Sequence, residues 1–287
     1  MSKKHCVHSH VYADDTQLYD SSTLVDAESV RDRLTSCISE VAKWCASRRL
    51  QLNAEKTEMI WFGSRSSLTK LQRINQSLQV GTNNIQPSSV VRDLGVYLDS
   101  ELSMKQHVAR TAAACFYHIR RLRQIRRRVG QEVTQQLVLA LIMSRLDYCN
   151  SVLAGLPMST LEPLQRVQNA AARLVFGLGR FDHVTPSLIQ LHWLPVSYRI
   201  KFKLCCFIHA IHYGRSPTYL TQTVQSVSAS RQRSGLRSSS TSAMDYSLPR
   251  LRTKFGERAF SHAGPSTWNS LPDNIRTVAD LPSFENC

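Results

Sequence analysis

Tyr12-Ala13-Asp14-Asp15-Thr16-Gln17-Leu18-Tyr19 follows a run of alternating residues that starts at Val7. Alternation is typical of a strand, and paired Asp residues are typical of a tight turn, because the short carboxylate bonds nearby backbone N–H groups. We therefore expect a strand, a turn and a second strand, with Asp14 and Asp15 at the tip.

Apolar spacing outward from this hairpin predicts a helix over 26–49. The apolar run 59–62 predicts a strand, and so does 78–80. The segment 90–99 (VVRDLGVYLD) predicts a short strand pair, in which Gly95 indicates a bulge or a close backbone approach. These elements place all the expected strands in the first hundred residues.

The rest of the chain has helical periodicity, and the predicted fold class is α+β. Residues 222–245 are rich in Ser, Thr, Gln and Arg, which is typical of a flexible linker. The predicted organisation is a mixed region over 1–100, a helical region over 101–221, this linker, and a small tail over 246–287. The predicted helices begin at 103 and then cover 131–147, 160–176 and 197–213.

The composition favours an acidic polymer as partner. The 287 residues carry a formal net charge of +15, with a pI near 9.8, and 42% are hydrophobic, enough for a real core. The eight cysteines form no CxxC pair, so we expect reduced thiols in an intracellular protein, nuclear or cytoplasmic or both. No stretch approaches 18 apolar residues, so no membrane partner is expected.

Asp14 and Asp15 are the candidate metal ligands. Two adjacent carboxylates at the tip of a hairpin repel each other unless a cation lies beside them. A hard divalent ion, Mg²⁺ or Mn²⁺, prefers carboxylate oxygens together with substrate phosphates, and two such ions support phosphoryl transfer. The alternative is a plain surface turn, in which the Asp side chains bond only local backbone.

The order of several segments resembles the reverse transcriptases of non-LTR (LINE-type, jockey-like) retrotransposons. The resemblance covers essentially the whole chain and implies a partial palm over 1–100, followed by a helical thumb. It rests on YADDTQLY, LQLNAEKTEMIWFG and VVRDLGVYLD, and then on LDYCNSVLAGLP, LEPLQRVQNAAARLVFG, HWLPVSYRIKFK and AFSHAGPSTWNSLP.

This resemblance implies an RNA-directed DNA polymerase with an RNA template, a DNA primer and dNTPs as partners. Asp14 and Asp15 match the family's metal-binding carboxylate and its neighbour, and Tyr12 matches the aromatic position beside the primer terminus. Lys56 matches a lysine near the triphosphate, where a cation stabilises the leaving group. The alternative for Lys56 is a solvated surface side chain.

Leu94 and Gly95 match the turn that contacts the primer, where a glycine permits close backbone approach. The alternative is an ordinary hairpin bulge.

The chain departs from the family upstream of the hairpin. Only eleven residues precede Tyr12, whereas the family's first catalytic aspartate lies on an earlier strand. We therefore expect a truncated polymerase that binds template and primer but does not extend alone. An unpaired strand edge on the partial palm predicts self-association.

An arginine cluster between residues 120 and 128 is the second candidate binding feature. On a helix, five of its members lie opposite the apolar stripe, and Arg126 lies along that stripe, so the helix is expected to end near Arg126. Such a basic face suits the phosphates of a template–primer duplex, and the alternative is a solvated helix face. The five are Arg120, Arg121, Arg123, Arg127 and Arg128.

Two sets of possible zinc ligands are weaker candidates, because neither has the spacing of a zinc motif. The two sets are Cys205, Cys206, His209 and His212, and His5, Cys6, His8 and His10.

The alternative functions of the whole chain are a non-enzymatic, basic helical nucleic-acid binder and a non-functional relic of a mobile element.

Overall fold

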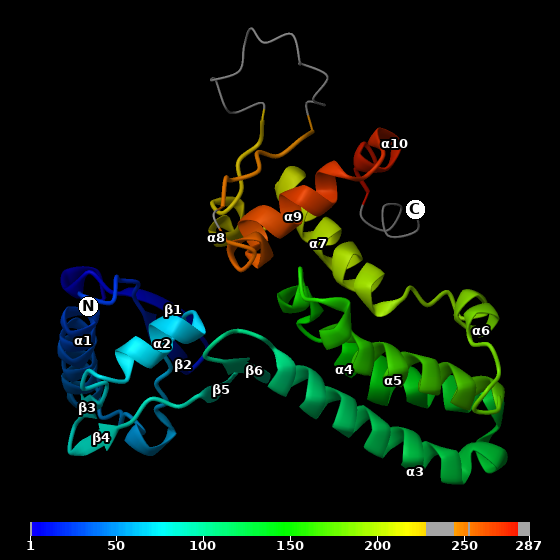
Figure 1. The fold of residues 1–287 in the computed structure, drawn as a ribbon, viewed down its shortest axis with the longest axis horizontal. Coiled ribbons are helices and arrows are strands. Elements are labelled where there is room, and N and C mark those ends of the chain that lie inside the picture. Colours follow the sequence, from blue (N-terminus) through cyan, green and yellow to red (C-terminus); the bar gives the residue numbers. More distant parts are fainter. Residues whose placement is uncertain (1, 228–243, 252, 281–287) are drawn as a thin grey trace, which may run out of the picture. The chain divides into compact units, whose positions relative to one another are not determined.

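The computed structural model describes residues 2–227, 244–251 and 253–280, and these have an α+β fold (Figure 1). All named strands lie before residue 100, and long helices follow. The chain divides into two compact units, 1–107 and 108–287. This division falls close in sequence to the boundary predicted at residue 100.

Three antiparallel hairpins make up the β structure of the first unit. Each forms its own two-stranded sheet, and among the described residues no sheet has more strands. The structure therefore shows the α+β class but no continuous palm sheet. The pairs are β1 (His8–Tyr12) with β2 (Asp15–Tyr19), β3 (Leu78–Val80) with β4 (Asn83–Ile85), and β5 (Val90–Asp93) with β6 (Val96–Asp99).

Helix α1 (Ala27–Ser47) confirms the helix expected over 26–49. One face of α1 supplies Ile38 to a buried cluster with Met59 and with the β3–β4 hairpin. Asp26 precedes the helix, but its carboxylate accepts a hydrogen bond from the Thr23 hydroxyl at 2.7 Å rather than from a helical N–H.

The strand expected over 59–62 is not formed. Backbone hydrogen bonds hold this segment near its ends, where Ser88 N–H donates to the Met59 carbonyl at 2.8 Å and Gly63 N–H donates to the Ser100 carbonyl at 3.0 Å. Strands β5 and β6 pair with each other, and in the described part of the chain the apolar run forms no ladder with either of them. A short helix, α2 (Arg65–Leu71), follows.

The second unit is helical, and α3 (Lys105–Val138) is its longest element. Gly130 interrupts α3 with φ 75° and ψ −178°, so it consists of two helices, 105–129 and 131–138. The first helix therefore runs three residues past the expected end near Arg126, and the second begins at residue 131, as predicted. A π-helical turn, Leu139–Met143, then leads into α4 (Ser144–Asp147).

The predicted helices over 160–176 and 197–213 are present as α5 (Met158–Phe176) and α7 (Val196–His212). Figure 1 shows α5 alongside α3. Two short helices, α6 (Thr185–Gln190) and α8 (Thr218–Thr221), precede and follow α7. Within the described ranges, no helix is both long enough and apolar enough to cross a membrane.

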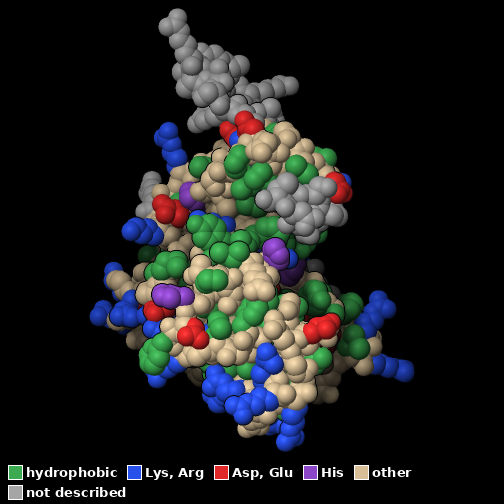
Figure 2. Space-filling view, turned by 90° about the vertical axis from the view of Figure 1, so that its right-hand side faces the viewer, with side chains coloured by type: hydrophobic (Ala, Val, Ile, Leu, Met, Phe, Trp, Pro, Cys, Tyr) green, Lys and Arg blue, Asp and Glu red, His purple; other side chains and the backbone are tan. Residues whose placement is uncertain are grey.

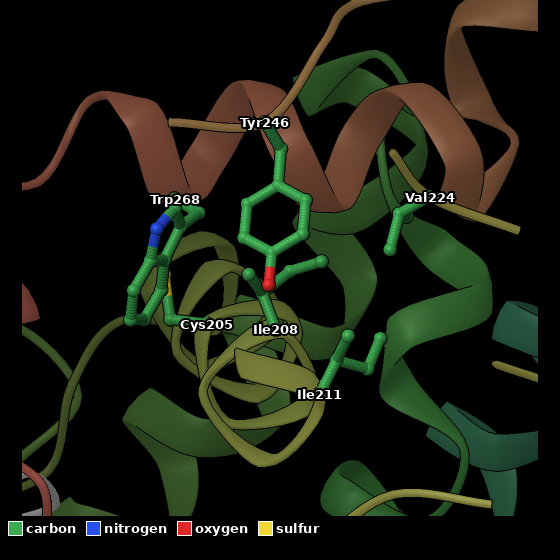
Figure 3. Close-up of a cluster of buried hydrophobic side chains, with 6 residues drawn as sticks. All are labelled: Cys205, Ile208, Ile211, Val224, Tyr246 and Trp268. Carbon is green, nitrogen blue, oxygen red and sulfur yellow. The ribbon is translucent and has the colours of Figure 1, made fainter. Parts of the chain in front are cut away.

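The tail packs onto α7. Helices α9 (Phe260–Asn269) and α10 (Asp273–Arg276) belong to a core in which Trp268 and Ile208 are fully buried (Figure 3). Residues 228–243 of the predicted linker lie outside the described residues. At its described start, Val224 is buried in the same core, so packed structure extends past residue 222.

Candidate nucleic-acid and metal site

The β1–β2 hairpin closes through a two-residue loop, Ala13-Asp14, because Tyr12 pairs with Asp15. Ala13 has φ 53°. A type II′ turn has a positive φ at its first loop residue but not at its second, and glycine usually occupies that first position. Alanine there costs on the order of 1–2 kcal/mol, and strain of this kind clusters at functional sites.

Asp14 and Asp15 are both exposed at this tip. Asp14 lies in the loop, and Asp15 begins β2 directly opposite Tyr12, so the side chains of Asp15 and Tyr12 share one face of the hairpin. Across the part of the chain that the structure describes, neither carboxylate forms an ion pair. The pair is therefore accessible to a cation and to an incoming phosphate.

The chemistry of this donor set fits Mg²⁺, which commonly takes one or two protein carboxylates and completes its shell with water and substrate phosphates. In the described residues, no group of three or more His, Cys, Asp and Glu side chains is placed to hold a metal ion by itself. Asp14 and Asp15 would therefore supply part of a coordination shell.

The base of the hairpin is fixed to α1. Arg33 of α1 forms a salt bridge with Asp20, the residue after β2. This hydrogen bond lowers the pKa of the Asp20 carboxyl below its ordinary value. At the same end His8 stacks on Tyr19, with ring centroids 5.4 Å apart. These contacts hold the strands while the tip stays in solvent.

The β5–β6 hairpin also closes through two residues, Leu94 and Gly95, with φ 43° and 86°. Positive φ at both loop positions is the pattern of a type I′ turn. Gly95 thus occupies the turn itself rather than a bulge. Leu94 is partly exposed at the tip.

A hydrogen bond joins the two hairpins. Gln17 Nε2 donates to Asp93 Oδ1 at 2.6 Å, although 76 positions separate the two residues. Gln17 is two residues after Asp15 and shares its face of β2. The hairpin face that carries Tyr12 and Asp15 therefore faces the end of β5, just before the Leu94-Gly95 turn. Sequence reasoning singled out neither Gln17 nor Asp93.

A double-mutant cycle on this bond should give a coupling free energy of about 1 kcal/mol, because the acceptor is charged and the pair is partly buried. The cycle uses Gln17→Ala, Asp93→Ala and the double variant, with urea unfolding followed by circular dichroism. As a control, a double-mutant cycle of Gln79→Ala with Asp93→Ala should show no coupling free energy. A Gln17–Asp93 coupling below about 0.3 kcal/mol would contradict the link.

Lys56 lies at the end of a short 3₁₀ turn, Ala54–Lys56, with its side chain exposed. The Asn53 side chain accepts from the Lys56 backbone N–H at 3.3 Å, which orders the backbone of this turn. Among the described residues, no hydrogen bond or ion pair links Lys56 to Asp14 or Asp15. Its role at a triphosphate stays a prediction.

Asp99 connects the β5–β6 hairpin to the helical region. Its carboxylate accepts from the backbone N–H groups of Ser103 and Met104, each at 2.8 Å. An acidic residue a few positions before a predicted helix was the available signal for this contact.

The arginine stripe of α3 lies on its exposed face, as predicted. The opposite face buries Val108, Cys115 and Ile119. Lys and Arg side chains also gather toward the lower end of the face in Figure 2. Phosphate contact by the stripe remains a prediction. The exposed members are Arg120, Arg121, Arg123, Arg127 and Arg128.

Arg126 has a structural role instead. It donates from Nε to the Leu174 carbonyl at 3.1 Å and from Nη2 to the Val175 carbonyl at 2.8 Å. These are among the last carbonyls of α5, which lack helical partners and lie at the negative end of its dipole. The guanidinium that lies along the apolar stripe thereby caps a neighbouring helix.

Tyr117 and His118 border the stripe. Arg121 Nη1 donates to the Tyr117 hydroxyl at 3.3 Å, and its guanidinium lies 5.9 Å from the ring centroid. Burial, with the charges of Arg145 and Arg121, lowers the pKa of His118 below its ordinary value. His118 is therefore neutral at pH 7, and the positive charge beside it comes from arginine.

The first zinc candidate is packed in the core of the second unit. Burial raises the pKa of the Cys205 thiol to about 12, which disfavours the thiolate that zinc needs. A ring nitrogen of His209 lies 2.8 Å from the Val278 carbonyl oxygen. In the second candidate, His5 pairs with Glu40 at 2.8 Å. These contacts favour structural roles for Cys205, His209 and His5.

No protein-family model, no curated protein and no solved structure matches this chain.

Proposed function

We propose that this chain is part of an RNA-directed DNA polymerase of the non-LTR retrotransposon type and that it binds a template–primer duplex. The supporting observation is the bond between Gln17 and Asp93. It joins the hairpin that carries two exposed carboxylates to the hairpin that carries the Leu94-Gly95 turn. The resemblance independently assigns these two segments to the metal ions and to the primer.

The proposal gives a role to each candidate residue of the two hairpins and to Lys56. Asp14 and Asp15 would hold Mg²⁺ or Mn²⁺, and the bound ion would supply activation of the primer hydroxyl and stabilisation of charge on the transferred phosphoryl group. Tyr12 lies beside the primer terminus, on the same hairpin face as Asp15. Gly95 lets the primer backbone approach its turn, and Lys56 compensates charge on the leaving pyrophosphate.

The arginine stripe contributes affinity rather than chemistry. Five exposed guanidinium groups along one helix face suit a phosphate backbone, whose contacts fix position without reading sequence. The stripe also supports a second candidate function, a basic helical nucleic-acid binder in which Asp14 and Asp15 are idle.

Residues 1–11 contain no Asp or Glu, so they add no carboxylate to Asp14 and Asp15. We expect a polypeptide of residues 1–287 to bind duplex without extending a primer, unless a further carboxylate is supplied to it. The outer edge of β1 has no partner strand in the described structure, which offers a surface for such pairing or for self-association.

Asp14→Asn should raise the Mg²⁺ concentration that half-saturates the metal-dependent part of duplex binding by about tenfold, because one ligand loses its charge. Binding of an RNA–DNA duplex is followed by fluorescence anisotropy, and extension of oligo(dT) on poly(rA) is assayed in parallel. Asp32→Asn, on the exposed face of α1, is the matched control and should behave as the wild type.

Three outcomes separate the alternatives. A half-saturating Mg²⁺ concentration that rises about tenfold in Asp14→Asn and stays unchanged in Asp32→Asn supports the metal site. Identical behaviour of the two variants would mean that the carboxylates are idle and would favour the basic binder. Extension by the wild type that vanishes in Asp14→Asn would show a complete site and refute the expected inactivity.

A further inference from the structure

A cleft of about 490 Å³ lies within the second unit, between the residues preceding α5, the first half of α7 and the segment that leads into α9. Its floor is apolar, with Leu153, Leu161 and Leu204 all buried. Its rim is polar and includes Ser197, Lys201, Lys254, Arg258, His262 and Ser266. The cleft is open to solvent on one side, and its volume gives room for a small organic group.

The rim is positively charged. Lys201 comes from α7, and Lys254 and Arg258 come from the segment before α9, whereas Glu257 is the one carboxylate among the described residues that line the cleft. Three cations against one anion favour a negatively charged ligand, and the apolar floor strengthens their field.

Aromatic rings accompany these cations. Tyr198 is 56% exposed at the cleft, and Lys201 Nζ lies 5.3 Å from its ring centroid. Arg258 is similarly placed 5.8 Å from the ring of Phe255, which is 52% exposed. Exposed rings next to cations form the usual surface for single-stranded nucleic acid, because bases stack on the rings and phosphates meet the charges.

The position of Arg258 depends on a glycine. Gly155 lines the cleft, and a Cβ atom there would lie 2.8 Å from Arg258 Cγ. Gly155 also has φ 67°, which side-chain-bearing residues rarely adopt. The backbone is thus shaped to let the arginine pack against the cleft wall.

We propose that this cleft binds a single-stranded nucleic acid, with one base on Tyr198 over the apolar floor and the flanking phosphates at Lys201, Lys254 and Arg258. The cleft shares no residue with the hairpins or with the arginine stripe. The inference therefore stands whether or not the chain takes part in polymerisation.

Tyr198→Ala in the whole chain should weaken binding of a fluorescent 15-nucleotide single strand by about tenfold, because a stacking platform is lost. Tyr198→Phe should bind as the wild type. Lys201→Gln should weaken binding severalfold. It should also reduce the slope of log K against log salt concentration by about 0.7, the value for one phosphate contact on a single strand. Lys203→Gln is the matched control, since Lys203 is exposed on α7 and lies near the Phe207 ring, but is not among the cleft residues.

Ser266→Trp tests the cleft without disturbing the core, since Ser266 is exposed on α9 and lines the cleft. The tryptophan should fill the space and weaken single-strand binding severalfold while duplex binding is unchanged. Equal losses for Lys201→Gln and Lys203→Gln would overturn the proposal, and so would undiminished binding by Tyr198→Ala. Equally tight binding of a poly-glutamate peptide would show that the cleft selects charge alone, and would also overturn it.

Discussion

Neutralising the arginine stripe of α3 is expected to weaken duplex binding by about a hundredfold or more at 150 mM salt. It should also lower the slope of log K against log salt concentration by about 4. Each guanidinium that contacts a phosphate releases a condensed counterion, and five such contacts dominate sequence-independent affinity. The variant replaces Arg120, Arg121, Arg123, Arg127 and Arg128 with Gln; all five are exposed, so folding should be preserved.

The control removes the same amount of charge from the first unit. If the stripe is the binding surface, this control should retain most of the affinity and most of the salt dependence. Equal losses in both variants would indicate attraction by net charge alone and would contradict a duplex site on α3. The control replaces Lys43, Arg48, Arg49, Lys70 and Arg73, which are also exposed, with Gln.

Trp268→Ala is expected to destabilise the second unit by about 3–5 kcal/mol, the range for removing a buried aromatic side chain. Trp268 is fully buried between α7 and α9, and its indole N–H donates to the Met244 carbonyl at 3.0 Å. Its ring lies 6.0 Å from that of His212 (Figure 3 shows the surrounding apolar side chains). Truncation opens a cavity and leaves this carbonyl without its donor.

Hydrogen exchange of the α7 backbone amides measures this loss locally, which suits a chain of two units that need not unfold together. Trp44→Ala is the matched control, because Trp44 is 45% exposed on α1. The Trp44→Ala substitution should leave the exchange rates of the α7 amides unchanged. If Trp268→Ala changed their exchange no more than this control, the tail would not be part of the core.

Much of the local structure was predictable from sequence. The YADD hairpin, α1, the β5–β6 pair, α5 and α7 follow from alternation, helical periodicity and turn residues, which are properties of short segments. The exposed arginine face of α3 was predictable for the same reason, because a helix with one apolar stripe must turn its other side to solvent.

The predictions of secondary structure that were wrong concern segments whose conformation depends on a partner far away in the chain. The run 59–62 has strand composition, but in the described structure it forms no ladder, and its Met59 and Trp61 side chains pack in the cluster around Ile38. Arg126 occupies an apolar position that would end an isolated helix, yet the carbonyl groups of α5 accept its guanidinium N–H groups. The break at Gly130, by contrast, falls in the gap that the sequence predicts between a helix ending near Arg126 and a helix beginning at 131.

By itself, the sequence determined the local elements that carry the candidate residues: two adjacent carboxylates on a tight turn, a glycine in a second turn, and a row of arginines on one helix face. Residue type and local spacing suffice for that. Only the tertiary structure decided which of them come together, since the Gln17–Asp93 bond and the cleft beside Tyr198 each join residues far apart in the chain. Such contacts depend on packing and loop closure, for which local propensity carries no signal.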